Sequence, residues 1–357
     1  MEPMSDSLPP APRWRREAGE VGRSLVRFGP GVGPRWHLAT QAAVAMAAPV
    51  VVLSVLGDEQ LGLLAATGAF AVLYGGRLTP RERSRVVPIV ALVLFASAAA
   101  GVGATLLGPL WVSAGLVLVA VVASAVSFGW SVGPPGPLFP VLLFGLSAHV
   151  VDPRAAHVDP VLYLGVTAAS LAFARAVVLA PLVRRRHRTA PARRIREIFA
   201  GPRWDAVART LVVRAALIAA LGTALSAVVD PERAYWIVSA GIAVLGVSVS
   251  RRVALTRGIH RALGTAAGGA LYLLLAVVPI PGAALGLVLG ALQFVVELVV
   301  VRHYALALVF ITPLVLMILG AAGAGGVDIA LERVVDTLVG AALGVLSGIV
   351  VMRERRA

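Results

Sequence analysis

The sequence predicts an all-α integral membrane protein with about twelve transmembrane helices, organised as two parallel six-helix repeats. Of its 357 residues, 59% are hydrophobic and 14% are charged, and the mean hydropathy is +0.88. This composition gives the chain more apolar surface than one soluble core can bury. Two further observations, the spacing of the apolar segments and the distribution of arginine, predict the number of helices and their orientation.

Apolar segments follow one another from Trp36 onward, each close to the roughly 20 residues that cross about 30 Å of hydrocarbon as a helix. The segment at 136–151 is short and follows a run of prolines and glycines, so a broken or re-entrant segment is an open alternative there. The predicted spans of the first repeat (36–183) are 36–56, 60–76, 86–107, 109–129, 136–151 and 160–183, and those of the second (210–352) are 210–229, 234–250, 260–278, 282–301, 303–321 and 330–352.

Arginine supplies all 32 basic residues and is divided unevenly between the predicted loops. With the amino terminus inside, 27 arginines fall in cytoplasmic segments, and only Arg154, Arg233 and Arg333 fall in outer loops. Such a bias is typical of membrane proteins, whose cytoplasmic loops are rich in basic residues. We therefore expect a multi-pass protein of a bacterial inner membrane with both termini cytoplasmic.

Matching residues recur in the two halves at a nearly constant displacement. Because each half has an even number of predicted spans, the two copies share one orientation and are related by a pseudo-two-fold axis along the membrane normal. We expect a conduit at this axis, where equivalent helix faces meet. Three pairs of residues are displaced by 172 to 176 positions: Asp58 and Asp230, Arg85 and Arg261, and Pro140 and Pro313.

The arm, the linker between the halves and the tail are predicted to be cytoplasmic and basic. Residues 1–35 form an arm that is either disordered or lies on the surface, and residues 353–357 form a short tail. The linker at 184–209 either lies on the anionic inner leaflet as a short helix or is solvated. The net charge of +14 is spread between apolar segments, so we expect membrane lipids, and not nucleic acid, as the anionic partner.

Charged residues inside predicted spans are candidates for function, because an unpaired charge in hydrocarbon is costly. Glu297 is predicted to be the only acid inside a span, either as a proton-coupling carboxylate or as a buried partner for an arginine. Arg214 and Arg175 lie inside spans near the cytoplasmic side, and Arg261 begins another span there. Each can attract a carboxylate through paired hydrogen bonds, with snorkelling to lipid phosphates as the alternative.

Motifs for catalysis are absent from the sequence. The histidines lack HExxH and HxxxH spacing, and there is no GxSxG. The lack of cysteine excludes thiolate sites, and the lack of lysine excludes a GxxxxGK[ST] phosphate loop. We therefore expect no enzyme, no catalytic residue, no metal site and no cofactor.

Several motifs of the second half resemble those of a known family. One of these motifs contains Gly264 and Gly268, whose GxxxG spacing lets membrane helices approach closely. The first half shares topology and spacing with the family but lacks its GTxxGG signature. Over about residues 208–352, the chain resembles the FUSC family, the fusaric-acid-resistance-like proteins grouped with aromatic acid exporters, in Arg214-Ala-Ala-Leu, Ala234-Tyr235-Trp236, Arg261-x-x-Gly264-Thr265-x-x-Gly268-Gly269, Phe310-Ile-Thr-Pro-Leu314 and Arg333-x-x-Asp336-Thr337-x-x-Gly340.

The resemblance implies an inner-membrane exporter of aromatic or other organic carboxylates, in which Arg261 and Arg333 are the family's recurring arginines. A secondary exporter with a path between the two halves is thus the leading hypothesis, and a passive anion channel of the same architecture is the alternative within transport. A non-transporting scaffold or accessory subunit is the alternative of another class. A periplasmic adaptor and a second copy of the chain remain open as protein partners.

Overall fold

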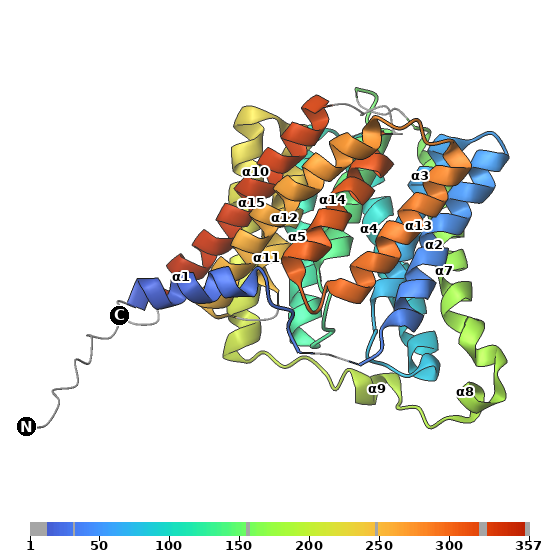
Figure 1. Cartoon of the computed structure of the whole chain (residues 1–357), viewed down its shortest axis with the longest axis horizontal. Coiled ribbons are helices and arrows are strands. Elements are labelled where there is room, and N and C mark those ends of the chain that lie inside the picture. The colour runs from blue at the N-terminus through green and yellow to red at the C-terminus, as the bar shows by residue number, and fades with distance from the viewer. Residues whose placement is uncertain (1–12, 31–32, 155–157, 247–248, 321–326, 354–357) are drawn as a thin grey trace, which may run out of the picture.

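The computed structural model describes residues 13–30, 33–154, 158–246, 249–320 and 327–353. The start of the predicted arm and the tail beyond Arg353 lie outside these residues. Over the described residues every regular element is helical, as predicted (Figure 1). The first half contains α1 (Arg13–Ser24), α2 (Trp36–Val55), α3 (Glu59–Ala65), the 3-10 helix η1 (Ala66–Leu73), α4 (Pro80–Leu107), α5 (Pro109–Gly129), α6 (Leu138–Val151), α7 (Pro160–Leu179) and η2 (Ala180–Val183).

The second half follows a linker that holds two short helices, α8 (Arg185–Thr189) and α9 (Ile195–Ile198). Each of the twelve predicted spans overlaps a helix of one half or the other. The helices of the second half are α10 (Ala206–Val229), η3 (Pro231–Arg233), α11 (Ala234–Leu245), α12 (Arg251–Ala276), α13 (Gly282–Val299), α14 (Tyr304–Gly320) and α15 (Val327–Arg353).

Seven helices in the described part of the chain are long and apolar enough to cross a membrane: α2, α4, α5, α7 extended by η2, α10, α12 and α13. Three more apolar helices are shorter, among them α6, whose 14 residues correspond to about 21 Å of helix. The chain is therefore a multi-pass membrane protein. The count of twelve spans stays a prediction.

Two helices begin six or more residues before their predicted spans. α4 begins at Pro80 and α12 at Arg251, so most of the arginines expected in the loop before each span lie in the first turns of the helix. At α4, the Thr79 hydroxyl accepts a hydrogen bond from the Glu82 amide, and the Glu82 carboxylate accepts one from the Thr79 amide. This capping box satisfies two amides that have no partner within the helix. A prediction from hydropathy alone places the end of a span at its first charged residues, although the helix in the structure continues through them.

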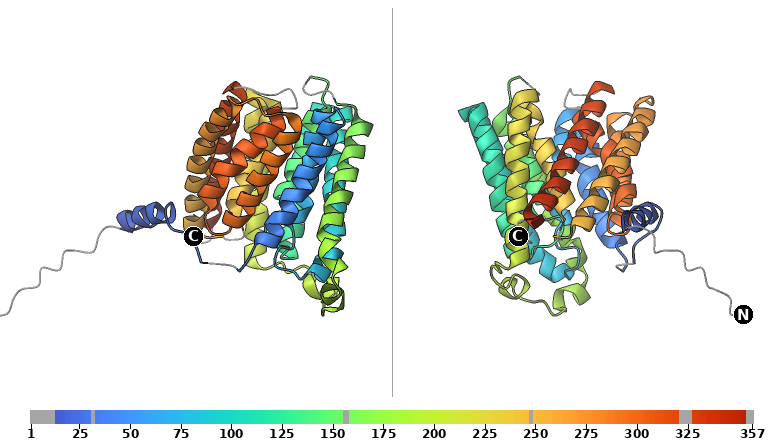
Figure 2. Two further views of the ribbon diagram at one scale, coloured as in Figure 1. Left: turned by 45° about the vertical axis from the view of Figure 1, so that its right-hand side comes forward. Right: turned by 90° about the vertical axis from the view of Figure 1, so that its left-hand side faces the viewer.

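Helices far apart in the sequence pack side by side. α2 lies along α13, and α10 lies along α5 (Figures 1 and 2). In the first of these pairs, a Cβ on Gly286 would lie 3.0 Å from the Val51 nitrogen, and one on Gly290 would lie 2.8 Å from the Ala47 Cβ. Glycine at these positions lets the two backbones approach closely. α6 and α11 also meet across the two halves, where Gly145 leaves room for Tyr235.

The segments expected to be cytoplasmic gather at one end of the bundle, which we call the inner end (Figure 1). α1, α8 and α9 all lie there. The linker contacts the start of α4, since Arg193 Nε lies 2.7 Å from Glu82 Oε1 and Arg81 Nη1 donates to the Ala190 carbonyl. These segments lie at the same end of the bundle, which agrees with the prediction that they lie on the same side of the membrane. The identity of that side stays a prediction.

Candidate functional site

The first turn of α11 and the outer part of α15 form a cluster of charged and aromatic side chains. We call it the outer cluster (Arg233, Tyr235, Trp236, Arg333 and Asp336). The Cζ atom of Arg333 lies 5.4 Å from the ring centroids of both Tyr235 and Trp236, a distance at which a guanidinium is attracted to an aromatic face. The Arg333 side chain is buried, and its Nε and Nη1 have no hydrogen-bond partner among the described residues. Arg333 thus has donors free for an additional acceptor.

Asp336 is the acid of the outer cluster and is only 1% exposed. Arg233 donates from Nε to its Oδ1 at 2.8 Å, and Arg233 Nη2 lies 2.6 Å from the same oxygen. Arg333 Nη1 lies farther away, 3.7 Å from Asp336 Oδ2. Two guanidinium groups therefore share one carboxylate, which leaves one excess positive charge. The prediction that Glu297 is the only acid inside a span was wrong, because Asp336 lies within α15.

The outer cluster lies where the two halves of the chain meet. The His149 ring of α6 lies 5.9 Å from the Tyr235 ring of α11, and His149 Nδ1 lies 3.5 Å from Glu232 Oε2. Glu232 belongs to η3, outside the apolar helices, and burial together with the carboxylates of Asp230 and Asp152 raises its pKa. A ligand at Arg333 would therefore lie beside both halves.

A second cluster lies at the inner end, where α12 and α14 begin. We call it the inner cluster (Arg257, Arg261 and Tyr304). Arg261 Nη1 donates to the Tyr304 hydroxyl at 3.0 Å, and Arg257 Cζ lies 4.4 Å from the centroid of the Tyr304 ring. The Nε atoms of both arginines are buried and have no hydrogen-bond partner in the described part of the chain. The inner cluster thus also has cationic donors free for an acceptor.

The amino-terminal arm passes beside the inner cluster. Ser24 Oγ lies 2.8 Å from His260 Nε2, and the Leu25 carbonyl oxygen lies 2.9 Å from His303 Nε2. The Phe28 and His303 rings are 5.1 Å apart. The described residues of the arm therefore contact α12 and the residue before α14.

Arg214 lies alone within the second half, between α10 and α15. It is fully buried, donates from Nε to Ser347 Oγ at 3.2 Å, and donates from Nη2 to the Gly344 carbonyl at 3.1 Å. A Cβ on Gly348 would lie 3.0 Å from Nη2, so this glycine leaves room for the guanidinium. No ion pair joins Arg214 to an acid among the described residues, and Nη1 has no hydrogen-bond partner there.

Glu297 is paired with Arg35, a residue of the predicted arm. Arg35 Nη2 donates to Glu297 Oε2, and Arg35 Nε donates to the Glu297 backbone oxygen, both at 2.8 Å. Gln293 Nε2 donates to the other carboxylate oxygen at 3.3 Å. One of the two interpretations given for Glu297, a buried partner for an arginine, is therefore what the structure shows. Proton coupling stays a prediction.

The Arg35–Glu297 pair predicts a stability effect. The two side chains are 19% and 7% exposed, so removing either leaves a poorly hydrated charge. We expect Glu297→Ala to lower the free energy of unfolding by about 3 kcal/mol, and Arg35→Ala with Glu297→Ala to recover part of the loss. Thermal unfolding in detergent measures both. Strictly additive effects of the two substitutions would show that the pair contributes no coupling.

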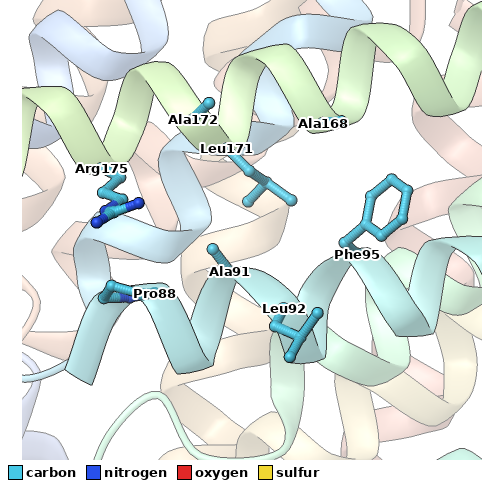
Figure 3. A pocket seen from close by; sticks show the side chains of 8 residues that line it. All are labelled: Pro88, Ala91, Leu92, Phe95, Ala168, Leu171, Ala172 and Arg175. Atoms are coloured by element: carbon cyan, nitrogen blue, oxygen red, sulfur yellow. The ribbon is translucent and has the colours of Figure 1, made fainter. Parts of the chain in front are cut away.

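Arg175 lies apart from both clusters. It lines a groove of about 270 Å³ between α4 and α7 (Figure 3). α7 packs against α2, α3, η1, η2 and α4, all of which belong to the first half. The structure therefore does not place Arg175 at the boundary between the halves.

The glycines of the second half pack against neighbouring helices. Gly264 and Gly268 face α14, and Gly269 lies against Val334 of α15. Thr265, between them, is buried. This motif therefore brings α12 into close contact with two helices, one on each side.

Sequence reasoning did not identify four residues that the structure places in these clusters, beside them, or in the pair with Glu297. Arg35 was assigned to the arm, Asp336 was named in a motif but not counted as an acid inside a span, and His260 and His303 were treated as scattered. Asp336 stands in the same motif as Arg333, which is the one local signal that pointed to it. Within the described residues, no three His, Asp or Glu side chains lie together as a metal site would require.

Comparisons with known proteins match the second half. Residues 217–347 match the model of a family described as fusaric acid resistance protein-like. The uncharacterized membrane protein YvaC of Bacillus subtilis (strain 168) is 36% identical over 127 residues, which are 34% of this chain and only 20% of YvaC. No solved structure matches the chain. The resemblance predicted from the motifs is thus confirmed, and residues 217–347, which hold Arg261 and Arg333, are similar to the fusaric acid resistance protein-like family.

Proposed function

We propose that this protein is a secondary transporter that exports small organic anions, with aromatic carboxylates as the favoured substrates. The observation that carries the proposal is Arg333, a buried guanidinium with two nitrogens free of hydrogen bonds to the described residues, beside the rings of Tyr235 and Trp236. A carboxylate accepts paired hydrogen bonds from a guanidinium, and an attached aromatic ring packs favourably on aromatic side chains. The outer cluster thus offers both parts of an aromatic carboxylate a complementary contact.

The inner cluster is the proposed entrance for the anion. At the inner end Arg261 donates to the Tyr304 hydroxyl and Arg257 lies over the Tyr304 ring, and each keeps a buried nitrogen free of hydrogen bonds to described residues. Arg214 is a proposed intermediate position, since it begins the third turn of α10 and has no acidic partner among the described residues. Arg257, Arg261 and Arg214 would thus draw an anion from the inner end towards Arg333.

The path is proposed to run between two six-helix repeats related by a two-fold axis. Reciprocal packing supports this arrangement. α2, the first helix of the first repeat, packs on α13, the fourth helix of the second, and α10 packs on α5 in the same relation. The outer cluster lies at this boundary through the contact between Tyr235 and His149.

We further propose that Glu297 couples export to protons through its pair with Arg35. Protonation of the carboxylate removes the charge that attracts Arg35, and this pair joins the segment before α2 to α13. Efflux from vesicles is expected to respond to an imposed pH gradient, and Glu297→Gln is expected to abolish that response. Thermal unfolding of the variant separates uncoupling from lost stability. Efflux by the native protein that ignores the pH gradient would favour a passive anion channel.

The protein is proposed to act in a bacterial inner membrane with the inner end facing the cytoplasm, alone, as an oligomer, or with a periplasmic adaptor. A deletion strain is expected to be sensitised to at least one acid in a panel of aromatic and aliphatic carboxylic acids. Arg261→Ala, expressed at the native level, is expected to reproduce that sensitivity. Arg251→Ala is the matched control, since Arg251 is exposed on the same helix. Normal growth of the deletion strain across the panel would contradict export of these acids.

A further inference from the structure

The groove between α4 and α7 is a second candidate binding site, independent of the proposed transport path. Four residues from α4, Pro88 to Phe95, and four from α7, Ala168 to Arg175, line its volume of about 270 Å³ (Figure 3). Small side chains at Ala91, Ala168 and Ala172 leave the space between the two helices open. Both helices are apolar enough to cross a membrane, and Leu92, Ala168 and Ala172 of the lining are exposed, so the groove opens at the surface of the bundle.

The lining is apolar along its length and charged at one end only. Leu92, Phe95 and Leu171 form its walls, and Arg175 is the single charged residue (Figure 3). Arg175 lies at the end of the groove nearer the inner end of α7, which is followed by η2 and three consecutive arginines, 184–186. The charge therefore lies towards one leaflet, and the apolar walls extend from it towards the bilayer centre.

Arg175 has no partner that the described chain supplies. Its side chain is exposed and forms no hydrogen bond or ion pair with any described residue. An unpaired arginine at membrane depth is costly, and an anion held at the same depth would reduce that cost. Free inorganic anions do not enter hydrocarbon readily. An anionic lipid, in contrast, holds its headgroup at the membrane surface and extends its acyl chain towards the bilayer centre.

We propose that this groove binds an anionic phospholipid of the inner leaflet. The phosphate lies on the Arg175 guanidinium, and part of one acyl chain lies in the groove against Leu92, Phe95 and Leu171. The volume is slightly below the range of sites that hold a whole small molecule, and it fits a segment of one chain. A bulky side chain at Ala172 would fill the groove next to the guanidinium.

Native mass spectrometry of the purified full-length protein tests the site, with phosphatidylglycerol and phosphatidylcholine of identical acyl chains added separately, and with palmitate in a third series. The native protein is expected to retain one phosphatidylglycerol with about tenfold higher affinity than phosphatidylcholine, because the choline cation of phosphatidylcholine offsets the charge of its phosphate and is repelled by Arg175. Arg175→Gln is expected to remove that preference, and Ala172→Trp to remove binding of both lipids. Arg251→Gln, an exposed arginine on α12, is expected to change nothing.

Three results would overturn the proposal. Equal retention of the two phospholipids by the native protein, or an unchanged preference in Arg175→Gln, would show that Arg175 does not distinguish the two headgroups. Tighter binding of palmitate than of phosphatidylglycerol would assign the groove to a fatty acid. A dimer that is lost in Ala172→Trp would assign it to a second copy of the chain. Thermal unfolding of Arg175→Gln, whose side chain is exposed, confirms that the variant is folded.

Discussion

Arg333→Ala is expected to reduce efflux of benzoate from preloaded vesicles by about tenfold to a hundredfold, because it removes charge-assisted hydrogen bonds to the carboxylate. Asp336 keeps its hydrogen bond from Arg233 in this variant, so the carboxylate is not left unpaired. Arg333→Lys is expected to be intermediate, since an ammonium keeps the charge and loses the paired geometry. Glu332→Gln is the matched control, because Glu332 is exposed one residue away on α15. Unchanged efflux in Arg333→Ala would remove this residue from the path.

Substitution of the aromatic side chains of the outer cluster distinguishes recognition of the substrate's charge from recognition of its ring. Tyr235→Leu and Trp236→Leu keep Arg333 but remove the aromatic faces beside it. We expect efflux of benzoate to fall more than efflux of propionate, because only benzoate has a ring to pack on these side chains. Equal losses for the two acids would indicate that the rings position Arg333 and do not select aromatic substrates.

Alanine at Gly264 and Gly268 together is expected to have the largest effect on stability. A Cβ at Gly264 would lie 2.7 Å from the Leu308 Cβ, and one at Gly268 would lie 2.8 Å from the Leu308 carbonyl oxygen and 2.7 Å from the Thr312 Cβ. These distances are too short, so α12 and α14 must separate. We expect each substitution to lower the free energy of unfolding by about 1–3 kcal/mol, and the double variant to be lost from the membrane.

Thermal unfolding in detergent and the protein level in membranes measure these losses. Gly103→Ala and Gly165→Ala are the matched controls, because a Cβ at either position has no neighbour within 4 Å. Both lie within helices, where alanine is favoured over glycine, so we expect no loss of stability. A loss in the controls as large as at Gly264 would show that close packing with α14 is not the cause.

The helices could be predicted because apolar length alone defines them. α5 at Pro109–Gly129 has the predicted bounds, and α2 and α13 end within two residues of theirs. The inner starts of α4 and α12 could not be predicted in this way, because Arg83 and Arg257 look like loop residues. In the structure the guanidinium groups of Arg83 and Arg257 donate to the carbonyls of Val72 and Ala243, so each arginine has a hydrogen-bond partner although it lies on a helix.

The candidate site was predictable only where a motif holds its members together. Arg333 and Tyr235 both belong to sequence motifs, and of the two Arg333 was named as a candidate. Arg35 and Glu297 are 262 residues apart, and Ser24 and His260 are 236 apart. Contacts over such separations depend on how the helices pack, and neither residue of a pair carries a local signal of the other.

The packing of α2 along α13 also bears on the order in which the protein is assembled. More than 220 residues separate the end of α2 from the start of α13. At the usual rate of about 5–20 residues per second, α13 emerges from the ribosome about 10 to 45 s after α2. During this interval the face of α2 that meets Gly286 and Gly290 has no protein neighbour and is exposed to lipid or to an insertion factor. Among the described candidate spans, the first along the chain is therefore among the last to complete its packing.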